Sequence, residues 1–239
     1  MNKQQFTTRF QTLAVHQNID ISNEKLEKIA EFFFLLHEQN RIHNLTGYKE
    51  TEDLFFFHFM DSLILYNHLN LKPNSLLTDV GTGAGIPGLI LKFLYPNLIL
   101  YLIESVRKKA AFLVEMKSYF NMRNCHILAE RSEIISQNNT HREKSDIVTA
   151  RALGPLSTTL ELTCPLAKKE GHIFLPRGSR EDDFEKSQAE LTLGCSFEKE
   201  IPYTLPGRDR NHRILIYKKN QKTDDKYPRK PSQIKKRPL

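Results

Sequence analysis

Four glycines flanked by two acids, between residues 75 and 104, form the pattern with the clearest chemical meaning in this chain. One apolar run ends at Asp79, and a second ends at Glu104. Between them lie the glycines Gly81, Gly83, Gly85 and Gly88. This order predicts strand, tight loop, helix and strand, with an acid at the tip of the second strand. Such an arrangement builds a nucleotide pocket at the carboxyl edge of a parallel sheet.

The choice of nucleotide depends mainly on Asp79. The G-x-G-x-x-G pattern from Gly83 to Gly88 also occurs in dinucleotide-binding proteins, so a nicotinamide-dependent oxidoreductase stays open as an alternative. A carboxylate at Asp79 would repel a pyrophosphate, whereas it would suit the ammonium and sulfonium of S-adenosylmethionine. Alternating glycines also let the backbone approach a ligand closely. The pattern therefore favours S-adenosylmethionine as the cofactor and methyl transfer as the reaction.

The methyl acceptor is narrowed by motifs that the chain lacks. Enzymes that methylate exocyclic amines usually carry an Asn/Asp-Pro-Pro-aromatic run after the fourth strand, but the segment from Asp146 to Arg151 is not followed by one. Methylation of a cytosine carbon needs an attacking thiolate, and Cys164 lies in an apolar helical stretch typical of a core cysteine. A ring nitrogen such as guanine N7 needs neither device. Besides the oxidoreductase, a second alternative to a methyltransferase stays open, which is a non-catalytic RNA-binding protein with a vestigial pocket.

Composition indicates a globular protein of ordinary type. The chain has 239 residues, of which 39% are hydrophobic and 26% charged. Its three cysteines have no paired or metal-like spacing, which is typical of a reducing compartment. No apolar run approaches the roughly 20 residues of a membrane helix, and the N-terminus has no apolar signal region. We therefore expect a cytoplasmic protein that needs no metal.

The net charge of +7 lies entirely at the C-terminus. Residues 218–239 contain nine Lys or Arg and two acids, whereas the remaining basic and acidic residues balance. Because this segment is also poor in apolar residues, we expect residues 220–239 to be a disordered tail. Charge alone leaves open whether the tail is a flexible arm for nucleic acid or a solubilising end.

Periodicity predicts helices first and an α/β sheet afterwards. Residues 1–70 are expected to be helical, with one helix behind the N-cap Ser22 and another over roughly Glu50–Leu69, where His58 and Asp61 share a face. Strands alternate with helices from residue 75, which indicates a mostly parallel sheet. The expected strands are Leu76–Val80, Leu98–Ile103, His126–Ala129, Asp146–Thr149 and His172–Leu175, followed by Phe197–Tyr203 and His212–Lys218, which pair antiparallel across a turn at Pro206-Gly207.

Six motifs resemble the bacterial ribosomal RNA small-subunit methyltransferase G family, also called GidB. The resemblance covers nearly the whole chain to about Lys219, and the basic tail beyond it is not typical of the family. The motifs are Asn44-Leu45-Thr46, His58 to Leu63, Asp79 to Gly88, Glu104-Ser105 followed by Arg107-Lys108-Lys109, Arg151-Ala152, and Pro206-Gly207 with His212-Arg213.

The resemblance implies a fold and an activity. The fold would be the Rossmann-like S-adenosylmethionine-dependent methyltransferase fold. It has a mostly parallel seven-stranded sheet with helices on both faces and an antiparallel last strand. Residues 1–70 would be a helical extension packed on a methyltransferase domain of residues 71–219. The implied activity is methylation of N7 of a guanine, position 527 in the usual numbering, in 16S ribosomal RNA. The expected partner is 16S rRNA or the small ribosomal subunit, and we expect a monomer.

The resemblance also assigns residues to the cofactor site. Gly81 and Ile86 would line the cofactor, Ser132 and Glu133 would contact its adenine region, and Arg151 would lie near the transferred methyl group. Glu104 matches the acidic strand end and, with Asp79, Gly83 and Gly85, completes the expected cofactor-binding set.

His58, Asp61 and Arg151 are the candidate catalytic residues. Sharing a helical face, His58 and Asp61 could form a hydrogen-bonded pair near the substrate base, where Asp61 would steady the positive charge on methylated guanine. The alternative is a buried polar pair that ties the N-terminal helices to the sheet. The chain departs from many family members at Gln39-Asn40, where they have Trp-Asn, and at Arg177-Gly178, where they have Lys-Gly. These changes leave the RNA contacts open.

Overall fold

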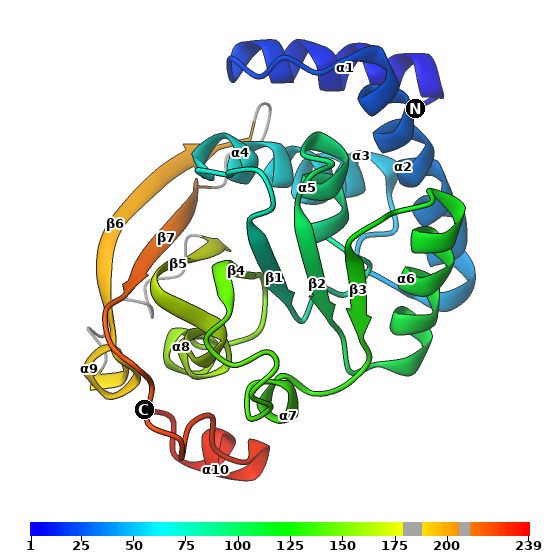
Figure 1. The fold of residues 1–239 in the computed structure, drawn as a ribbon. Coiled ribbons are helices and arrows are strands. Elements are labelled where there is room, and N and C mark those ends of the chain that lie inside the picture. The colour runs from blue at the N-terminus through cyan, green and yellow to red at the C-terminus, as the bar shows by residue number, and fades with distance from the viewer. Residues whose placement is uncertain (179–187, 206–210) are drawn as a thin grey trace.

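The computed structural model describes residues 1–178, 188–205 and 211–239, and its centre is a seven-stranded sheet (Figure 1). The strands run in the order β3-β2-β1-β4-β5-β7-β6. Their bounds are β1 Leu76–Val80, β2 Ile99–Ile103, β3 Cys125–Leu128, β4 Ser145–Ala150, β5 Ala167–Gly178, β6 Cys195–Thr204 and β7 Asn211–Lys219. The first five strands pair in parallel, and β7 pairs antiparallel with both β5 and β6. The expected fold class is confirmed, whereas the turn predicted at Pro206-Gly207 lies outside the described residues.

Strand register brings the expected site to one edge of the sheet. Val80, the last residue of β1, pairs with Ile103 at the end of β2 and with Ala150 at the end of β4. The residues that follow these three strands therefore leave the sheet side by side. The strand order also reverses direction at β1, and this is where α/β sheets place their ligands.

Alternating side chains give the sheet two apolar faces. One face carries Leu77, Leu100 and Leu102 and shares a core with the N-terminal helices. The other carries Val80 and Val148 and packs against helices near the C-terminus. The helices are α1 Lys3–His16, α2 Asn23–His43, α3 Thr51–Leu54, α4 Asp61–His68, α5 Gly88–Leu94, α6 Arg107–Tyr119, α7 Ser132–Ile135, α8 Leu156–Thr163, α9 Gln188–Leu193 and α10 Pro231–Lys236. Helices on both faces were expected from the sequence, and none of the described helices is long and apolar enough to span a bilayer.

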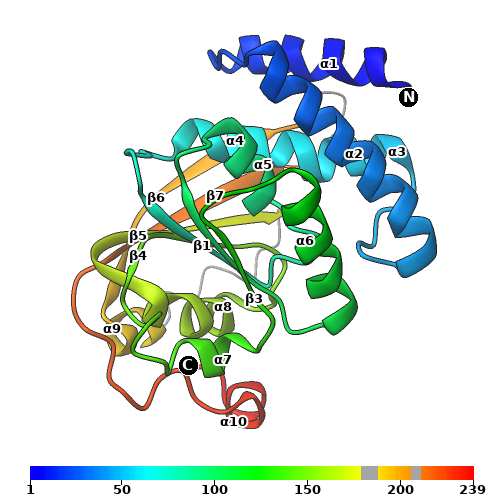
Figure 2. The same cartoon turned by 45° about the vertical axis from the view of Figure 1, so that its right-hand side comes forward.

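The N-terminal helices pack on one another through buried aromatic rings. Phe6, Phe33 and Phe59 contact one another with ring centroids 4.6 to 5.7 Å apart, and all three are fully buried. Figures 1 and 2 place α1 and α2 at the opposite end of the molecule from α10. Residues 1–70 are thus helical, as predicted, although their division from the sheet into a separate unit stays a prediction.

The expected helix over Glu50–Leu69 contains a π-helical turn. The α-helices α3 and α4 are joined without a break by a π-helix over Phe55–Met60. A π-turn accommodates one more residue per turn than an α-helix and often occurs at functional sites. It lies directly before Asp61 and includes His58, two of the candidate catalytic residues.

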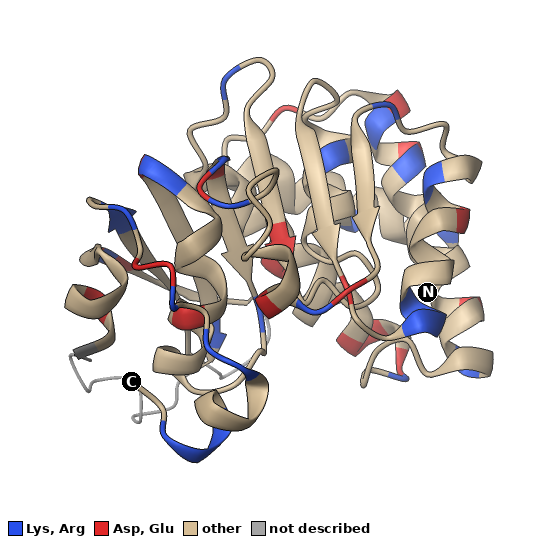
Figure 3. Cartoon of the chain, turned by 60° about the horizontal axis from the view of Figure 1, so that its bottom comes forward, with Lys and Arg blue, Asp and Glu red and all other residues tan. Residues whose placement is uncertain are grey.

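The expectation that residues 220–239 are disordered was wrong. Basic residues recur along this tail (Figure 3), but its backbone is packed against the body. Tyr227 and Ile234 are buried, and Thr223 is fully buried. Composition failed as a guide because the tail is held through backbone carbonyls and a few ion pairs, which a count of apolar residues does not reveal.

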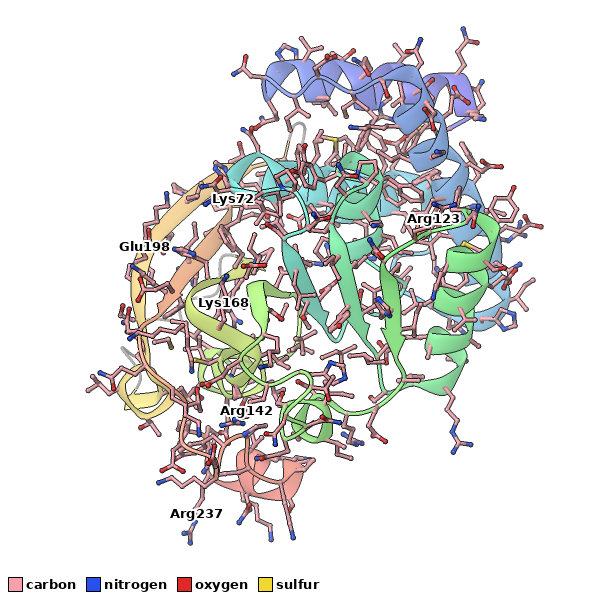
Figure 4. All side chains as sticks on the ribbon, in the orientation of Figure 1. Lys72, Arg123, Arg142, Lys168, Glu198 and Arg237 are labelled. Atoms are coloured by element: carbon pink, nitrogen blue, oxygen red, sulfur yellow. The ribbon has the colours of Figure 1, made fainter. Side chains whose placement is uncertain are left out.

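A buried arginine holds this tail. Arg142 is 7% exposed and donates to the carbonyl oxygens of Thr223 at 2.9 Å, Asp224 at 3.1 Å and Tyr227 at 2.8 Å. The same guanidinium donates to the Ser136 carbonyl oxygen at 3.0 Å, just after α7. Figure 4 shows Arg142 between the body and the tail, whereas Arg237 lies on the outer side.

Two further ion pairs fix the same segment. Arg229 forms a two-pronged pair with Glu161, whose side chain is fully buried. Lys219, fully buried beside Thr223, pairs with Glu143 at 3.5 Å and donates to the Leu193 carbonyl oxygen at 3.1 Å. Cys164, expected in the core, is fully buried there and contributes no reactive surface.

We expect Arg142→Met to destabilise the protein by about 3 kcal/mol, because it leaves three buried carbonyl oxygens and one part-buried carbonyl oxygen without their donor. Urea unfolding monitored by circular dichroism measures the loss. The matched control is Arg123→Met, since Arg123 is exposed and lies far from the tail (Figure 4), and an exposed change is expected to cost less than about 0.5 kcal/mol. Equal losses in the two variants would contradict the role given to Arg142.

Candidate active site

The loop after β1 is closed by hydrogen bonds to Asp79. One carboxylate oxygen, Oδ2, accepts from Thr82 Oγ1 at 2.6 Å and from the Gly88 N–H at 2.9 Å. The carboxylate is fully buried, and its other oxygen, Oδ1, has no hydrogen-bond partner among the described residues. Asp79 therefore shapes the loop with one oxygen and keeps the other available.

Glu104 holds the same loop from the neighbouring strand. Its Oε2 accepts from the Gly83 N–H at 3.0 Å, and its Oε1 accepts from the Val106 N–H at 2.7 Å. Gly83 adopts φ +62°, a conformation that glycine enters without strain, and the space around its missing side chain is open. Glu104 thus fixes the turn through which a ligand would reach the loop backbone.

Burial makes the ionised form of Asp79 energetically unfavourable at neutral pH. Burial raises its pKa from 3.8 to about 6, although the bonds from Thr82 and Gly88 and the charge of Arg151 oppose the rise. The folded state therefore keeps a proton that the unfolded state has released between pH 3.8 and 6. The stabilising contribution of this carboxyl group is present below pH 3.8 and is lost as the pH rises to 6, a cost of about 3 kcal/mol. An unpartnered buried oxygen of an anion fits a cofactor that carries an ammonium group.

Stabilisation by S-adenosylhomocysteine is therefore expected to grow between pH 5 and pH 7.5. The ammonium of this ligand relieves the cost of ionised Asp79 but gains little from a protonated one. Thermal shift at a fixed ligand excess measures the trend. Two controls should show no such rise: methylthioadenosine, which lacks the ammonium, and the Asp79→Asn variant. A thermal shift that stays constant across this pH range would contradict the assignment.

Arg151 gathers the candidate catalytic residues around its guanidinium. It follows β4 directly, and Nη1 donates to Asp61 Oδ2 at 3.1 Å and to the Phe57 carbonyl oxygen. Its other terminal nitrogen, Nη2, contacts Nδ1 of His58. The side chains of Arg151 and Asp61 are 18% and 7% exposed, so their pair is largely shielded from solvent. The widened helical turn supplies Phe57, and so the carbonyl acceptor.

His58 is a neutral acceptor in this cluster. Burial and the charge of Arg151 hold its pKa well below 6.5. Since Arg151 can only donate, Nδ1 of His58 must accept from it, and the 3.1 Å approach of Nδ1 to the Phe57 carbonyl oxygen is then not a hydrogen bond. With Arg151 as the donor, the tautomer of neutral His58 that fits these contacts carries its proton on Nε2, which is 2.7 Å from Thr46 Oγ1.

The direct pair expected between His58 and Asp61 is not formed between these two described residues. Both side chains bind Arg151 instead, because the π-turn changes the angular relation between positions that an α-helix would place on one face. The structure brings the three candidates together, but through the arginine.

Tyr203 belongs to the cluster and was not expected from the sequence. Its hydroxyl donates to Asp61 Oδ1, and burial followed by the charge of Asp61 raises the pKa of Tyr203, so it stays a donor. It comes from β6, 142 positions from Asp61. No motif marks Tyr203; only the strand order, with β7 inserted beside β5, carries β6 to this place.

The cluster and the glycine loop are neighbours. The charge of Arg151 acts on Asp79, and Leu153 lies where a side chain on Gly81 would project. Lys109 of α6 lies 4.0 Å from the corresponding position on Gly83, and its charge also acts on His58. An anion-lined loop thus lies beside a guanidinium cluster at the edge where β1 and β4 end.

The remaining predicted residues lie around the same edge. Gly85 has φ +88° within the loop, and Ile86 is buried after it. Ser132 and Glu133 begin α7, where Ser132 Oγ donates to the Leu162 carbonyl oxygen at 2.9 Å and is therefore already occupied. Arg177 donates to the Gly154 carbonyl oxygen at 3.0 Å. Their roles toward cofactor or RNA stay predictions.

Comparison with known proteins identifies the family. A family model described as GidB, rRNA small subunit methyltransferase G, matches residues 25–224. The chain belongs to this family. The GidB match includes the whole glycine loop and the whole guanidinium cluster, and it confirms the resemblance drawn from the sequence.

Relatives named ribosomal RNA small subunit methyltransferase G match along almost the whole chain. The protein of Listeria monocytogenes serotype 4b is 31% identical, covering 97% of this chain and 98% of its own. That of Bacillus licheniformis is 32% identical and covers 100% and 99%, and that of Lactococcus lactis subsp. cremoris is 35% identical and covers 93% and 94%. The Bacillus match extends through the tail, whereas the family model ends at residue 224, so whether the tail is typical of the GidB family stays open.

Solved structures support the fold alone. The YcgJ protein of Bacillus subtilis is 9% identical and gives a TM-score of 0.53 over 69% of this chain and 100% of its own. TYW2 of Pyrococcus horikoshii, in complex with MeSAdo, is 13% identical and gives a TM-score of 0.50 over 67% of this chain and 62% of its own.

Membership of the GidB family makes the chain an S-adenosylmethionine-dependent rRNA methyltransferase, and the oxidoreductase alternative is not favoured.

Proposed function

We propose that this enzyme transfers a methyl group from S-adenosylmethionine to N7 of a guanine in 16S rRNA, at position 527 in the usual numbering. The observation that carries the proposal is the guanidinium cluster beside the glycine loop. S-adenosylmethionine supplies an electrophilic methyl group. The residues expected to hold it are Asp79 and Glu104 with the loop between them.

Methylation of N7 needs no general base. The N7 lone pair attacks directly and no proton leaves it, so a neutral His58 is compatible with the reaction. Transfer moves a positive charge onto the purine. The Asp61 carboxylate balances Arg151, so the cluster adds no net charge beside the new cation. Asp61 would steady the cationic product, while Arg151 and Tyr203 hold its carboxylate in place.

The acceptor is proposed to be the small ribosomal subunit or its 16S rRNA, with the enzyme acting as a cytoplasmic monomer. Among the described residues, no group of three or more metal-ligating side chains gathers, and the reaction drawn here uses no metal. A vestigial, non-catalytic pocket is disfavoured by the intact loop with both flanking acids.

Incubation with a labelled methyl donor tests the proposal. The acceptors are small subunits from a strain that lacks this protein and, in parallel, naked 16S rRNA from the same strain. We expect one labelled guanine at N7, located by strand cleavage at the modified base. Label at another atom, or in both wild-type and deficient subunits alike, would overturn the assignment.

A further inference from the structure

Thr46 ends a directed chain of hydrogen bonds that begins at Arg151. Arg151 donates to Nδ1 of His58, and Nε2–H of His58 donates to Thr46 Oγ1 at 2.7 Å. The Tyr48 N–H donates to the same oxygen at 3.3 Å. A threonine hydroxyl has two lone pairs and one proton. With both lone pairs engaged, the Thr46 hydroxyl can act toward a further partner only as a donor.

The donor is held in place but has no acceptor. Asn40, which is buried, accepts from the Thr46 N–H at 2.8 Å and donates to the Tyr48 carbonyl oxygen at 2.8 Å, so it fixes both sides of the loop. Thr46 itself is half-buried, and once the His58 Nε2–H donates to Oγ1, no hydrogen bond among the described residues takes up the hydroxyl proton. The direction of the chain is set by Arg151, which cannot accept, and a charged donor at its head strengthens the bonds that follow.

Such a donor distinguishes the purines. Beside N7, guanine presents the acceptor O6, whereas adenine presents an amino group that donates. If N7 of the bound purine faces the methyl donor, the group on C6 faces the side of the site that carries Thr46. A hydroxyl restricted to donation bonds O6 and finds no acceptor on the amino group of adenine.

Resting on the proposed function, we infer that Thr46 is the specificity-determining donor that binds O6 of the target guanine, with His58 and Arg151 fixing its direction. The assignment explains why a neutral histidine lies at this place. It also gives the Asn44-Leu45-Thr46 motif a chemical role.

The test pairs a protein change with a base change. Wild type, Thr46→Val and Thr46→Ser are assayed under single-turnover conditions on small subunits reconstituted with 16S rRNA that carries guanine or 2-aminopurine at the target. 2-Aminopurine keeps N7 but lacks O6. We expect Thr46→Val to lower the rate on guanine about 10- to 100-fold and the rate on 2-aminopurine less than about threefold. Thr46→Ser, which keeps the hydroxyl, is expected to stay within about threefold of wild type on both.

Two readouts separate specificity from folding. Melting temperature is expected to fall by only a few degrees in Thr46→Val, because the His58 Nε2–H loses its acceptor, and S-adenosylhomocysteine affinity is expected to be unchanged. Nitrogen-15 NMR of histidine is expected to show neutral His58 with its proton on Nε2, and a proton on Nδ1 would overturn the inference.

Equal losses on both bases would reduce Thr46 to a support for its loop, and no loss on either would remove its role altogether. Each result overturns the inference while the proposed function stands. Failure of the wild type to methylate the guanine-containing subunit would instead refute the proposed function.

Discussion

Arg151→Gln lowers kcat by about 10²-fold, the loss typical when groups of an active site are no longer held in position. Glutamine cannot bind Asp61, the Phe57 carbonyl oxygen and His58 together, so the cluster loses its centre and its positive charge. Single-turnover methylation of small subunits measures the effect. Arg123→Gln, an exposed change far from the pocket, is the control and should keep full activity.

Loss of activity must be distinguished from loss of the fold. Arg151→Gln leaves Asp61 buried without its cation, which is expected to cost about 3 kcal/mol of stability. The double variant Asp61→Asn with Arg151→Gln removes both charges and should recover part of that stability but none of the activity. A single variant that keeps more than about a third of wild-type kcat would contradict the role of Arg151.

Gly83→Asp abolishes binding of S-adenosylhomocysteine, with an affinity loss of about 100-fold or more. The position has room for a side chain, since Lys109 Nζ at 4.0 Å is the nearest atom, so the fold should tolerate the change. The new side chain then occupies the space that the ligand needs, and its charge repels the ligand's carboxylate. Isothermal titration measures the loss, and melting temperature reports on the fold.

Gly83→Ala is the matched control for backbone strain. Both variants place a side chain at φ +62° and carry a similar cost of about 1 kcal/mol. Alanine adds only one methyl group, so we expect it to bind at least tenfold more tightly than the aspartate variant. Equal affinities would mean that the strained turn, and not the filled space, controls binding.

The fold could be predicted because its signals are local. Apolar runs ending at Asp79 and Glu104 located β1 and β2 to within one residue, and Ser22 does precede α2. The antiparallel pair at the end was also predicted. The short helices α7, α9 and α10 were missed, since four to six residues carry too little periodicity to stand out.

The site was predicted only in part. The glycine loop and Arg151 follow strand ends, so pattern and resemblance found them. Tyr203 could not be found in this way, because it reaches Asp61 only through the order of β5, β7 and β6. The neutral state of His58 also escaped, since it depends on burial and on which atom of Arg151 faces the ring.

The structure of the tail also depends on contacts that the sequence pattern does not reveal. Charge composition described its surface correctly but said nothing of Arg142, which lies in a stretch, Gln137–Ser145, that reads as an ordinary polar loop. One buried guanidinium with four carbonyl acceptors outweighs a composition that otherwise favours disorder.

The π-turn sets the phase of the helix that carries His58 and Asp61. An α-helix rotates by about 100° per residue, and a π-turn absorbs one surplus residue without breaking the helix. Phe55, Phe56 and Phe57 therefore act as a spacer of fixed length in addition to their packing. A ring could be exchanged for another apolar side chain at Phe56, but a shortened spacer would swing the histidine away from Arg151 by about a quarter of a circle. Over this stretch, natural variation should keep the number of residues and the apolar character of buried Phe55 and Phe57, while half-buried Phe56 varies more freely.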